Sequence, residues 1–325
     1  MSDSTNPSTP KPSPSHPEMT PAPVLLTGAT GFIGTSIQRL LLDSGTSVRA
    51  LVRPGSAHLG AVDPRCELFQ CSLTDSAALN EAVSKVSAVV YCAGSVRGRT
   101  LDDFLPANVD GVRNLVSALR EQQLTAPFLL ISSLAASRPE LSNYAHSKFL
   151  GEETLQEQAA PPWTILRPPA VYGPGDTEMR PILKLARRGL VVRPGPKNQR
   201  VSLLYADDLA SAVAAWLKSW EQCAGKTYAI DDGHPGGYDW ASIVAAAGNA
   251  RLREVGIPAP MLGAIARLNY LAATLFAYAP MLSPGKVREL TQADWLCDNT
   301  AFVQATGWQP QIGLPSGIRL SLEQH

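Results

Sequence analysis

Two side chains that lie four residues apart could together move a proton. Tyr144 and Lys148 have the spacing of residues that share one face of a helix. A free tyrosine hydroxyl has a pKa near 10 and is a poor base at neutral pH. A lysine ammonium one turn away favours the phenolate and so lowers that pKa. The pair therefore predicts proton transfer to or from a substrate oxygen, and a surface Tyr–Lys pair is the alternative.

Three glycines earlier in the chain could hold phosphates. Gly28, Gly31 and Gly34 follow the apolar run 24–26 and precede apolar residues at helical spacing. Gly28 permits a tight turn, Gly31 lets the backbone approach a pyrophosphate, and Gly34 lets the helix lie close to the sheet. The helix N-terminus adds free N–H groups and a partial positive charge. We therefore expect a dinucleotide site, with a purely structural turn as the alternative.

These residues lie in a chain whose short apolar runs alternate with helical segments. Repeated strand–helix alternation is typical of an α/β fold with a doubly wound parallel sheet covered on both faces. We expect helices between 34 and 45 and over 76–86, 108–119 and 144–158. Strands are expected at 24–26, 48–52, 67–69, 88–91, 128–131 and 163–166.

The composition divides the chain into three segments. Residues 1–22 are rich in proline and serine and nearly free of apolar side chains, so we expect a disordered tail that is not a secretory signal. Residues 23–170 carry the Rossmann pattern and form the expected NAD(P)-binding domain. Residues 171–325 should form mainly a smaller substrate-binding domain, interleaved with the last sheet strands, with a strand near 201–205 and a helix over 207–220.

Several motifs together resemble one family, the extended short-chain dehydrogenase/reductases of the NAD-dependent epimerase/dehydratase superfamily. The resemblance covers residues 24–320 and is nearest to the 3-beta-hydroxysteroid dehydrogenase and dihydroflavonol reductase-like branch. It implies a Rossmann fold and an enzyme that uses NADP or NAD. The motifs that carry it are Thr27–Gly34, Val90–Gly94, Asn108–Gly111, Ile131–Ser133, Tyr144–Lys148, Arg167–Gly175 and Tyr205–Ala210.

The resemblance also assigns roles to the catalytic candidates. Tyr144 would donate or accept the hydroxyl proton, and Lys148 would bind the nicotinamide ribose and tune Tyr144. Ser133 would hydrogen-bond the substrate oxygen, with Ser132 as the alternative. Asn108 would support the architecture around the site, although as the first residue of a helix it could be only an N-cap. Relatives that act as sensors or structural subunits keep the same fold, and the intact Tyr–Lys pair argues against that role.

The choice between NADP and NAD depends on the end of the second expected strand. An acidic residue there selects NAD by binding the adenosine ribose. Arg53 occupies this position instead and could pair with a 2′-phosphate, so NADP is favoured and NAD stays open. Ser72 stands where relatives carry an aspartate that bonds adenine, and Asp75 is expected to cap a helix. The cofactor-binding residues implied are Gly28, Thr30, Gly31, Phe32, Ile33, Gly34, Arg53, Ser72, Leu73, Ala93, Gly94 and Lys148.

The substrate is expected to be a small molecule with a largely apolar body that carries a ketone or a secondary alcohol. Ala170 stands where many sugar-nucleotide enzymes have an asparagine, and residues 256–284 are strongly apolar, so they could wall an apolar pocket or simply pack. A nucleotide sugar is the alternative, because five arginines between 180 and 200 could pair with a diphosphate. A membrane span over 256–284 is disfavoured by Arg267 in its middle.

The composition limits the other partners. The formal net charge is zero, which argues against nucleic acid as the main partner. The five cysteines and five histidines lack metal-ligand spacing, so we expect no metal, and free thiols in a cytoplasmic protein. Whether the chain forms a homodimer is left open.

The acidic pair Asp207–Asp208 precedes an expected helix and is interpreted as capping and packing.

Overall fold

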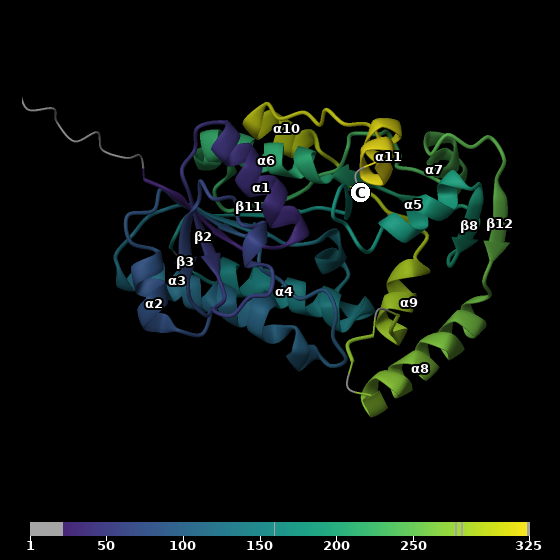
Figure 1. Ribbon diagram of the computed structural model, residues 1–325, viewed down its shortest axis with the longest axis horizontal. Helices are drawn as coiled ribbons and strands as arrows, with labels where there is room; N and C mark the ends of the chain where they lie inside the picture. The colour runs from purple at the N-terminus through teal and green to yellow at the C-terminus, as the bar shows by residue number, and fades with distance from the viewer. Residues whose placement is uncertain (1–21, 159, 277, 281, 324–325) are drawn as a thin grey trace, which may run out of the picture.

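A seven-stranded parallel sheet forms the centre of the computed structural model, which describes residues 22–158, 160–276, 278–280 and 282–323 (Figure 1). Its order is β3-β2-β1-β4-β5-β6-β11, the doubly wound order with one further strand. The sheet confirms the predicted fold class. The predicted tail falls almost wholly outside the described residues. The strands are β1 Val24–Thr27, β2 Val48–Val52, β3 Glu67–Gln70, β4 Ala88–Tyr91, β5 Phe128–Ile131, β6 Trp163–Arg167 and β11 Lys226–Ala229.

Helices cover both faces of this sheet. Every residue of β1, β4 and β5 is buried, as expected where apolar runs are covered on two sides. One core unites the sheet with α1 (Phe32–Asp43), α6 (Ala206–Cys223) and α10 (Thr300–Thr306). The other core includes α2 (Ser76–Ala82), α3 (Gly111–Glu121) and α4 (Asn143–Gln156). The carboxyl ends of the strands therefore meet at one open edge, where a parallel sheet binds its ligands.

The predicted elements differ from the structure in three places. A π-helical turn, Pro106–Asp110, leads into α3, so Asn108 lies inside a helical segment and is not its N-cap. The strand expected at 201–205 is split into β9 (Arg200–Val201) and β10 (Leu203–Tyr205), both outside the central sheet. β10 pairs with β7 (Ala170–Tyr172), and β9 with β13 (Asp294–Trp295). The seventh strand, β11, was not predicted.

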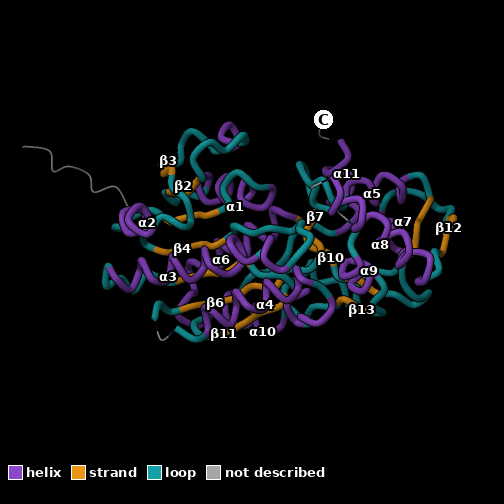
Figure 2. The backbone as a smooth tube through the Cα atoms, turned by 90° about the horizontal axis from the view of Figure 1, so that it is seen from below, coloured by secondary structure: helices purple, strands orange, loops and turns teal. Residues whose placement is uncertain are grey.

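A third core lies beyond the carboxyl ends of the strands. It joins residues from Tyr172 to Leu322 and includes α5 (Arg180–Arg187), α7 (Trp240–Ala246) and α11 (Leu314–Glu323). β8 (Leu190–Arg193) pairs with β12 (Arg253–Gly256) at the outer end of this part, away from β3 and α2 (Figure 2). Because α6 and β11 belong to the main sheet, a smaller C-terminal domain with a boundary near residue 170 stays our prediction.

Two further helices complete the C-terminal part. α8 (Ala259–Phe276) follows β12, and α9 (Pro284–Leu290) then returns toward α4 (Figure 1). Among the residues that the structure describes, none of the helices has both the length and the hydropathy that crossing a membrane requires.

Candidate active site and dinucleotide loop

The glycine loop between β1 and α1 is too crowded for side chains. Gly28 has φ of +67°, a left-handed conformation, and a Cβ there would lie 2.7 Å from the carbonyl oxygen of Cys92. A Cβ on Gly34 would collide with the backbone of Gly28. The sequence therefore needs glycine at these positions to bring α1 against the sheet.

The N-terminus of α1 is open to an anion. Gly31 is its N-cap, and no side chain of the described residues caps it. Next to the loop, the Thr27 hydroxyl accepts hydrogen bonds from the backbone N–H groups of Cys92 and Ala93 at 3.1 and 3.0 Å. This holds the chain after β4, which includes Gly94, beside the glycine loop. The arrangement fits a pyrophosphate, whose charge would meet the free N–H groups of α1.

The positions expected to select the cofactor follow β2 and β3. Arg53 comes directly after β2 and is exposed. The Ser72 hydroxyl lies 2.8 Å from that of Thr74 and accepts a hydrogen bond from its backbone N–H. Asp75 accepts from the N–H of Ala78 at 3.1 Å, which confirms that it is the N-cap of α2.

The Tyr–Lys pair lies near the start of α4, whose N-cap is Ser142. Tyr144 lines a cavity of about 270 Å³ together with Ser133, and the two side chains hydrogen-bond to each other. Ser132 points elsewhere: its hydroxyl donates to Glu152, which forms a buried ion pair with Arg167. Of the two neighbouring serines, only Ser133 therefore lines the described cavity.

The electrostatics of Tyr144 differ from the sequence-based expectation. Burial is the largest cause and raises the pKa of the Tyr144 hydroxyl. The hydrogen bond with Ser133 and the charge of Lys286 lower this pKa, and the charge of Glu289 raises it. The net shift is upward. The ammonium of Lys148 donates to the carbonyl of Ile131 at 3.2 Å, and burial lowers the pKa of this lysine. The expected lowering of the Tyr144 pKa by Lys148 is therefore not seen, because the cation that acts on the phenol is Lys286.

Asn108 holds the two halves of the site together. Its amide donates to the Ser147 hydroxyl at 2.8 Å and to the Ser95 carbonyl at 3.1 Å, and its oxygen accepts from the Ser95 N–H at 3.0 Å. Ser147 lies on α4 between Tyr144 and Lys148. Asn108 thus ties α4 to the chain that follows β4, although it caps no helix.

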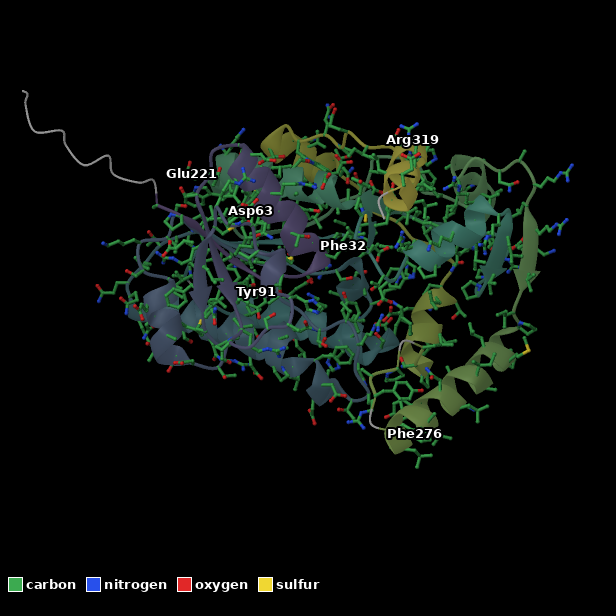
Figure 3. The ribbon with its side chains drawn as sticks, viewed as in Figure 1. Phe32, Asp63, Tyr91, Glu221, Phe276 and Arg319 are labelled. Atoms are coloured by element: carbon green, nitrogen blue, oxygen red, sulfur yellow. The ribbon has the colours of Figure 1, made fainter. Side chains whose placement is uncertain are left out.

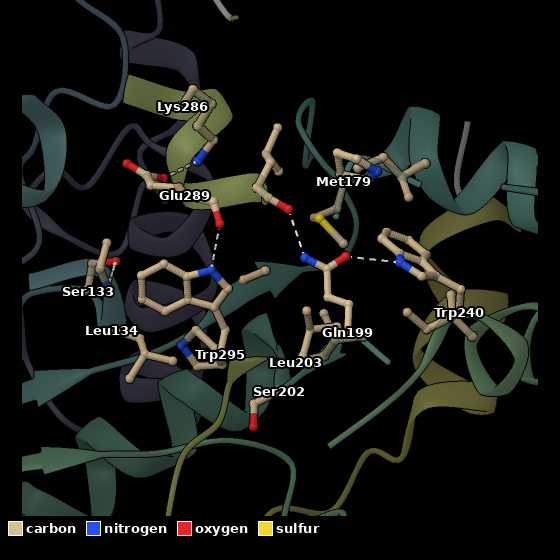
Figure 4. Close-up of a pocket in the computed structure, with 18 of the residues that line it drawn as sticks. Ser133, Leu134, Met179, Gln199, Ser202, Leu203, Trp240, Lys286, Glu289 and Trp295 are labelled. Atoms are coloured by element: carbon tan, nitrogen blue, oxygen red, sulfur yellow. Dashed lines mark hydrogen bonds and ion pairs between the residues drawn. The ribbon is translucent and has the colours of Figure 1, made fainter. Parts of the chain in front are cut away.

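The far wall of the cavity comes from the C-terminal part of the chain (Figure 4). Lys286 and Glu289 of α9 pair at 2.8 Å, and the indole N–H of Trp295 donates to the Glu289 carbonyl at 2.9 Å. Gln199 accepts from the indole of Trp240 at 3.1 Å and donates to the Leu290 carbonyl at 2.7 Å. Sequence reasoning missed these residues, because they belong to no motif and the fold alone brings them to Tyr144.

Apolar side chains make up most of the rest of the lining. Ala170 lies in it, at the start of β7, as does Met179. Of the two alternatives for residues 256–284, an apolar wall or ordinary packing, the structure favours packing, because the described lining of this cavity includes none of them. α8 instead packs on α9, which separates it from the cavity.

The acidic pair Asp207–Asp208 lies within the first turn of α6, whose N-cap is Tyr205, so it packs as expected but does not cap this helix. Both carboxylate oxygens of Asp208 accept backbone hydrogen bonds, from Gln311 and Ile312, at 2.9 Å each. Asp207 forms an ion pair with Arg39 on α1. The pair therefore ties the C-terminal segment and α1 to α6.

Comparison with known proteins identifies the class to which this fold and site belong. The model of the NAD dependent epimerase/dehydratase family matches residues 24–230, and the chain belongs to this family. It is thus an enzyme of an NAD-binding family with a Rossmann sheet, and its substrate is a small molecule.

Particular relatives differ in what they act on. Ceramide reductase of Caulobacter vibrioides is 33% identical over 91% of this chain and 92% of its own length. The 2-alkyl-3-oxoalkanoate reductase of Stenotrophomonas maltophilia is 28% identical over 91% of this chain and 97% of its own. UDP-glucuronic acid 4-epimerase from Bacillus cereus, solved in complex with NAD, superposes with a TM-score of 0.68 at 18% identity, covering 92% of this chain and 96% of that one. This last likeness shows the fold alone.

Proposed function

We propose that this enzyme reduces a ketone, or oxidises the matching secondary alcohol, on a small molecule with a long apolar body. The observation that carries the proposal is that Tyr144 and Ser133 share one cavity with a mostly apolar lining. Two relatives support it, since their names give a ceramide and a 2-alkyl-3-oxoalkanoate as substrates. Both of these compounds carry alkyl chains, which an apolar cavity would bind by the hydrophobic effect.

The residues have complementary tasks in the reductive direction. A nicotinamide cofactor held by the glycine loop and Lys148 would supply a hydride for the carbonyl carbon. Tyr144 donates its phenolic proton to the carbonyl oxygen, so that a secondary alcohol results, and Ser133 holds that oxygen beside the phenol. The phenol of Tyr144 is protonated at neutral pH, as this direction requires, and the upward shift of its pKa does not change that. Lys148, buried beside Gly94, would hold the nicotinamide ribose.

We propose NADP as the preferred cofactor. Arg53 offers an exposed guanidinium directly after β2, where a 2′-phosphate would lie. The next carboxylate along the chain, Asp63, is already paired with Arg65. The glycine loop serves NADP and NAD equally, so this proposal depends on Arg53.

A nucleotide-sugar epimerase or dehydratase is the alternative function. A diphosphate in this cavity would need cationic partners, since burying its charge without them costs many kcal/mol. Among the described residues that line the cavity, Lys286 is the basic side chain, and Glu289 already pairs with it. The five arginines between 180 and 200 do not line it. These features favour an uncharged apolar substrate.

A substrate panel tests the proposal. Oxidation of NADPH is followed with 2-alkyl-3-oxoacids and with ceramide-like lipids that bear a ketone in place of the secondary hydroxyl. Thermal stabilisation by UDP- and GDP-sugars is measured in parallel, with NADP present. Turnover of the ketones is expected; stabilisation by a nucleotide sugar alone, without ketone turnover, would overturn the proposal.

Two tyrosine variants test the catalytic assignment. Tyr144→Phe should lower turnover by about a thousandfold or more, because no other group donates the proton, while NADP binding stays unchanged. Tyr172→Phe is the matched control: its hydroxyl is buried and lacks a hydrogen-bond partner among the described residues, so its loss should change turnover little. Near-normal turnover in the Tyr144 variant would mean that another group donates the proton, whereas a wild type that binds NADP but turns over no ketone would be a sensor or structural subunit.

A further inference from the structure

The exposed face of α8 is apolar along its whole length. Leu268, Leu275 and Phe276 have exposed fractions of 68%, 80% and 77%. At about 100° per residue, these side chains fall in one sector of roughly 140° that contains no polar residue. The members of this sector, called the α8 face below, are Met261, Ala264, Ile265, Leu268, Leu271, Ala272, Leu275 and Phe276.

The opposite side of α8 fixes the direction of this face. Leu262 and Ala266 are buried against Val287 of α9. Asn269 also donates to the carbonyl of Leu282 at 2.8 Å. One side of the helix therefore packs against the rest of the protein, and the α8 face points into the solvent. Figure 3 shows Phe276 at the outer end of α8, away from Phe32 at the start of α1 and from Tyr91 on β4.

Exposed hydrophobic side chains are concentrated here. Of the fourteen large ones in the described part of the chain, nine lie between Leu252 and Tyr278. A contiguous apolar surface of this kind marks a site of interaction with a membrane or a partner.

The surroundings of α8 are basic, although the whole chain is neutral. Residues 180–200 contain seven lysines or arginines and no acidic residue. Arg253 on β12 and Arg251, two residues before that strand, are exposed, as is Arg267 on α8 itself. The nearby Glu254 is paired with Arg193. An apolar helical face beside exposed arginines has the composition of a helix that lies in the interface of an anionic bilayer.

The start of α8 lies beside a second cavity. This cavity, of about 430 Å³, is lined by Ile257 and Pro258, just before α8, and by Pro194. Pro194 lines the active-site cavity as well. The start of α8 therefore neighbours a space that adjoins the site of Tyr144.

We propose that α8 docks this enzyme on the surface of an anionic phospholipid bilayer. The α8 face enters the boundary between headgroups and acyl chains, and Arg251, Arg253 and Arg267 meet the headgroup phosphates. A second copy of the chain fits this surface less well, because a self-complementary contact would bring like-charged arginines together. The inference is independent of the proposed function, since docking requires no turnover.

Flotation with vesicles tests the docking. The full chain is mixed with vesicles of phosphatidylcholine alone and of phosphatidylcholine with phosphatidylglycerol, and we expect it to float mainly with the anionic vesicles. Leu268→Ser with Leu275→Ser should lower the partition coefficient by about tenfold or more, since two apolar side chains no longer enter the bilayer. Leu59→Ser with Leu68→Ser, at exposed positions on the main sheet side, is the matched control and should float like the wild type.

Further measurements distinguish bilayer docking from misfolding and from dimerisation. NADP affinity and melting temperature should be the same in all variants, because the substituted leucines are exposed. Arg251→Gln with Arg253→Gln should weaken binding to the anionic vesicles and leave the weak binding to neutral ones unchanged. The proposal is overturned if the wild type does not float, or if the α8 variant floats equally well. It is also overturned if sedimentation shows a dimer that the α8 substitutions dissociate while flotation persists.

Discussion

Two lysines act at the candidate site from different parts of the chain. Lys148 is buried beside Gly94, where a Cβ would lie 3.1 Å from its ammonium nitrogen. Lys286 has a side chain that is 46% exposed, lines the cavity and pairs with Glu289. Burial lowers the pKa of Lys286, but the charge and hydrogen bond of Glu289, together with the charges of Tyr144 and Glu178, raise it, and the net shift is upward. Lys286 therefore carries its positive charge at neutral pH, where this charge acts on the phenol of Tyr144.

The effect of Lys286 on Tyr144 can be measured through pH. In the oxidative direction Tyr144 must accept a proton, so the rate should rise with pH as the phenol ionises, and the raised pKa places this rise above the ordinary value for tyrosine. Lys286→Met removes a charge that lowers this pKa. The rise in kcat for alcohol oxidation should then move to higher pH, while ketone reduction at neutral pH, which needs the protonated phenol, should change little.

The control for this experiment is Lys184→Met, on an exposed position of α5 outside the cavity lining. Its profile should match that of the wild type. If the dependence of kcat on pH is also unchanged in Lys286→Met, the charge of Lys286 does not set it, and another group does.

The sequence reveals a functional residue when the partners of that residue lie nearby along the chain. The glycine loop and the Tyr–Lys pair could be found because each acts within one turn or one helix, so spacing alone carries the information. The choice of Ser133 over Ser132 needed the structure, which shows that Glu152 holds the Ser132 hydroxyl. Lys286 could not be found, because only the return of α9 to α4 brings it to Tyr144.

At the level of elements, the first six strands of the sheet were predictable because each is a short run of mainly apolar residues beside a helical segment. β11 was missed, since Lys226 and Thr227 interrupt the apolar pattern and it follows the eighteen-residue helix α6. The apolar stretch 256–284 was recognised, but its role was not. Hydropathy alone cannot distinguish the side of α8 that packs on α9 from the side that faces outward.

The end of β2 should determine the choice of cofactor. Arg53→Asp removes the partner of a 2′-phosphate and adds an acceptor for a ribose diol, so both changes act in the same direction. The ratio of the Kd for NAD to the Kd for NADP should fall by about a hundredfold, from the loss of one charge-assisted contact and the gain of repulsion. Titration of both cofactors into both proteins measures this ratio.

Arg319→Asp makes the same charge change at an exposed position on α11 and should leave the ratio unaltered. An equal response of the two variants would indicate a long-range effect of net charge. An unchanged ratio in Arg53→Asp would show that another residue selects the cofactor.

At the scale of the whole molecule, the cavity is assembled from two distant parts of the chain. Ser133 and Tyr144 belong to the sheet and α4, while Lys286, Glu289 and Trp295 come from the C-terminal part. Ser142 joins them: its hydroxyl donates to Glu289 and accepts the N–H of Ala145 at 2.9 Å. The contact is close, because a Cβ on Gly285 would lie 2.8 Å from the Ser142 side chain. One hydroxyl thus caps α4 and holds α9 against it.

Ser142→Ala should therefore affect the substrate more than the cofactor. Loss of an N-cap costs about 1 kcal/mol of stability, and here it also releases Glu289 and loosens the α9 wall, so KM for the ketone should rise several-fold. The Kd for NADP should not change, since the glycine loop is held by other contacts. Asp75→Ala removes the N-cap of α2 and should cost similar stability with no change in KM, which separates a loosened wall from a general loss of stability. A wild-type KM in Ser142→Ala, or an equal rise in Asp75→Ala, would show that this hydroxyl does not couple the two parts of the cavity.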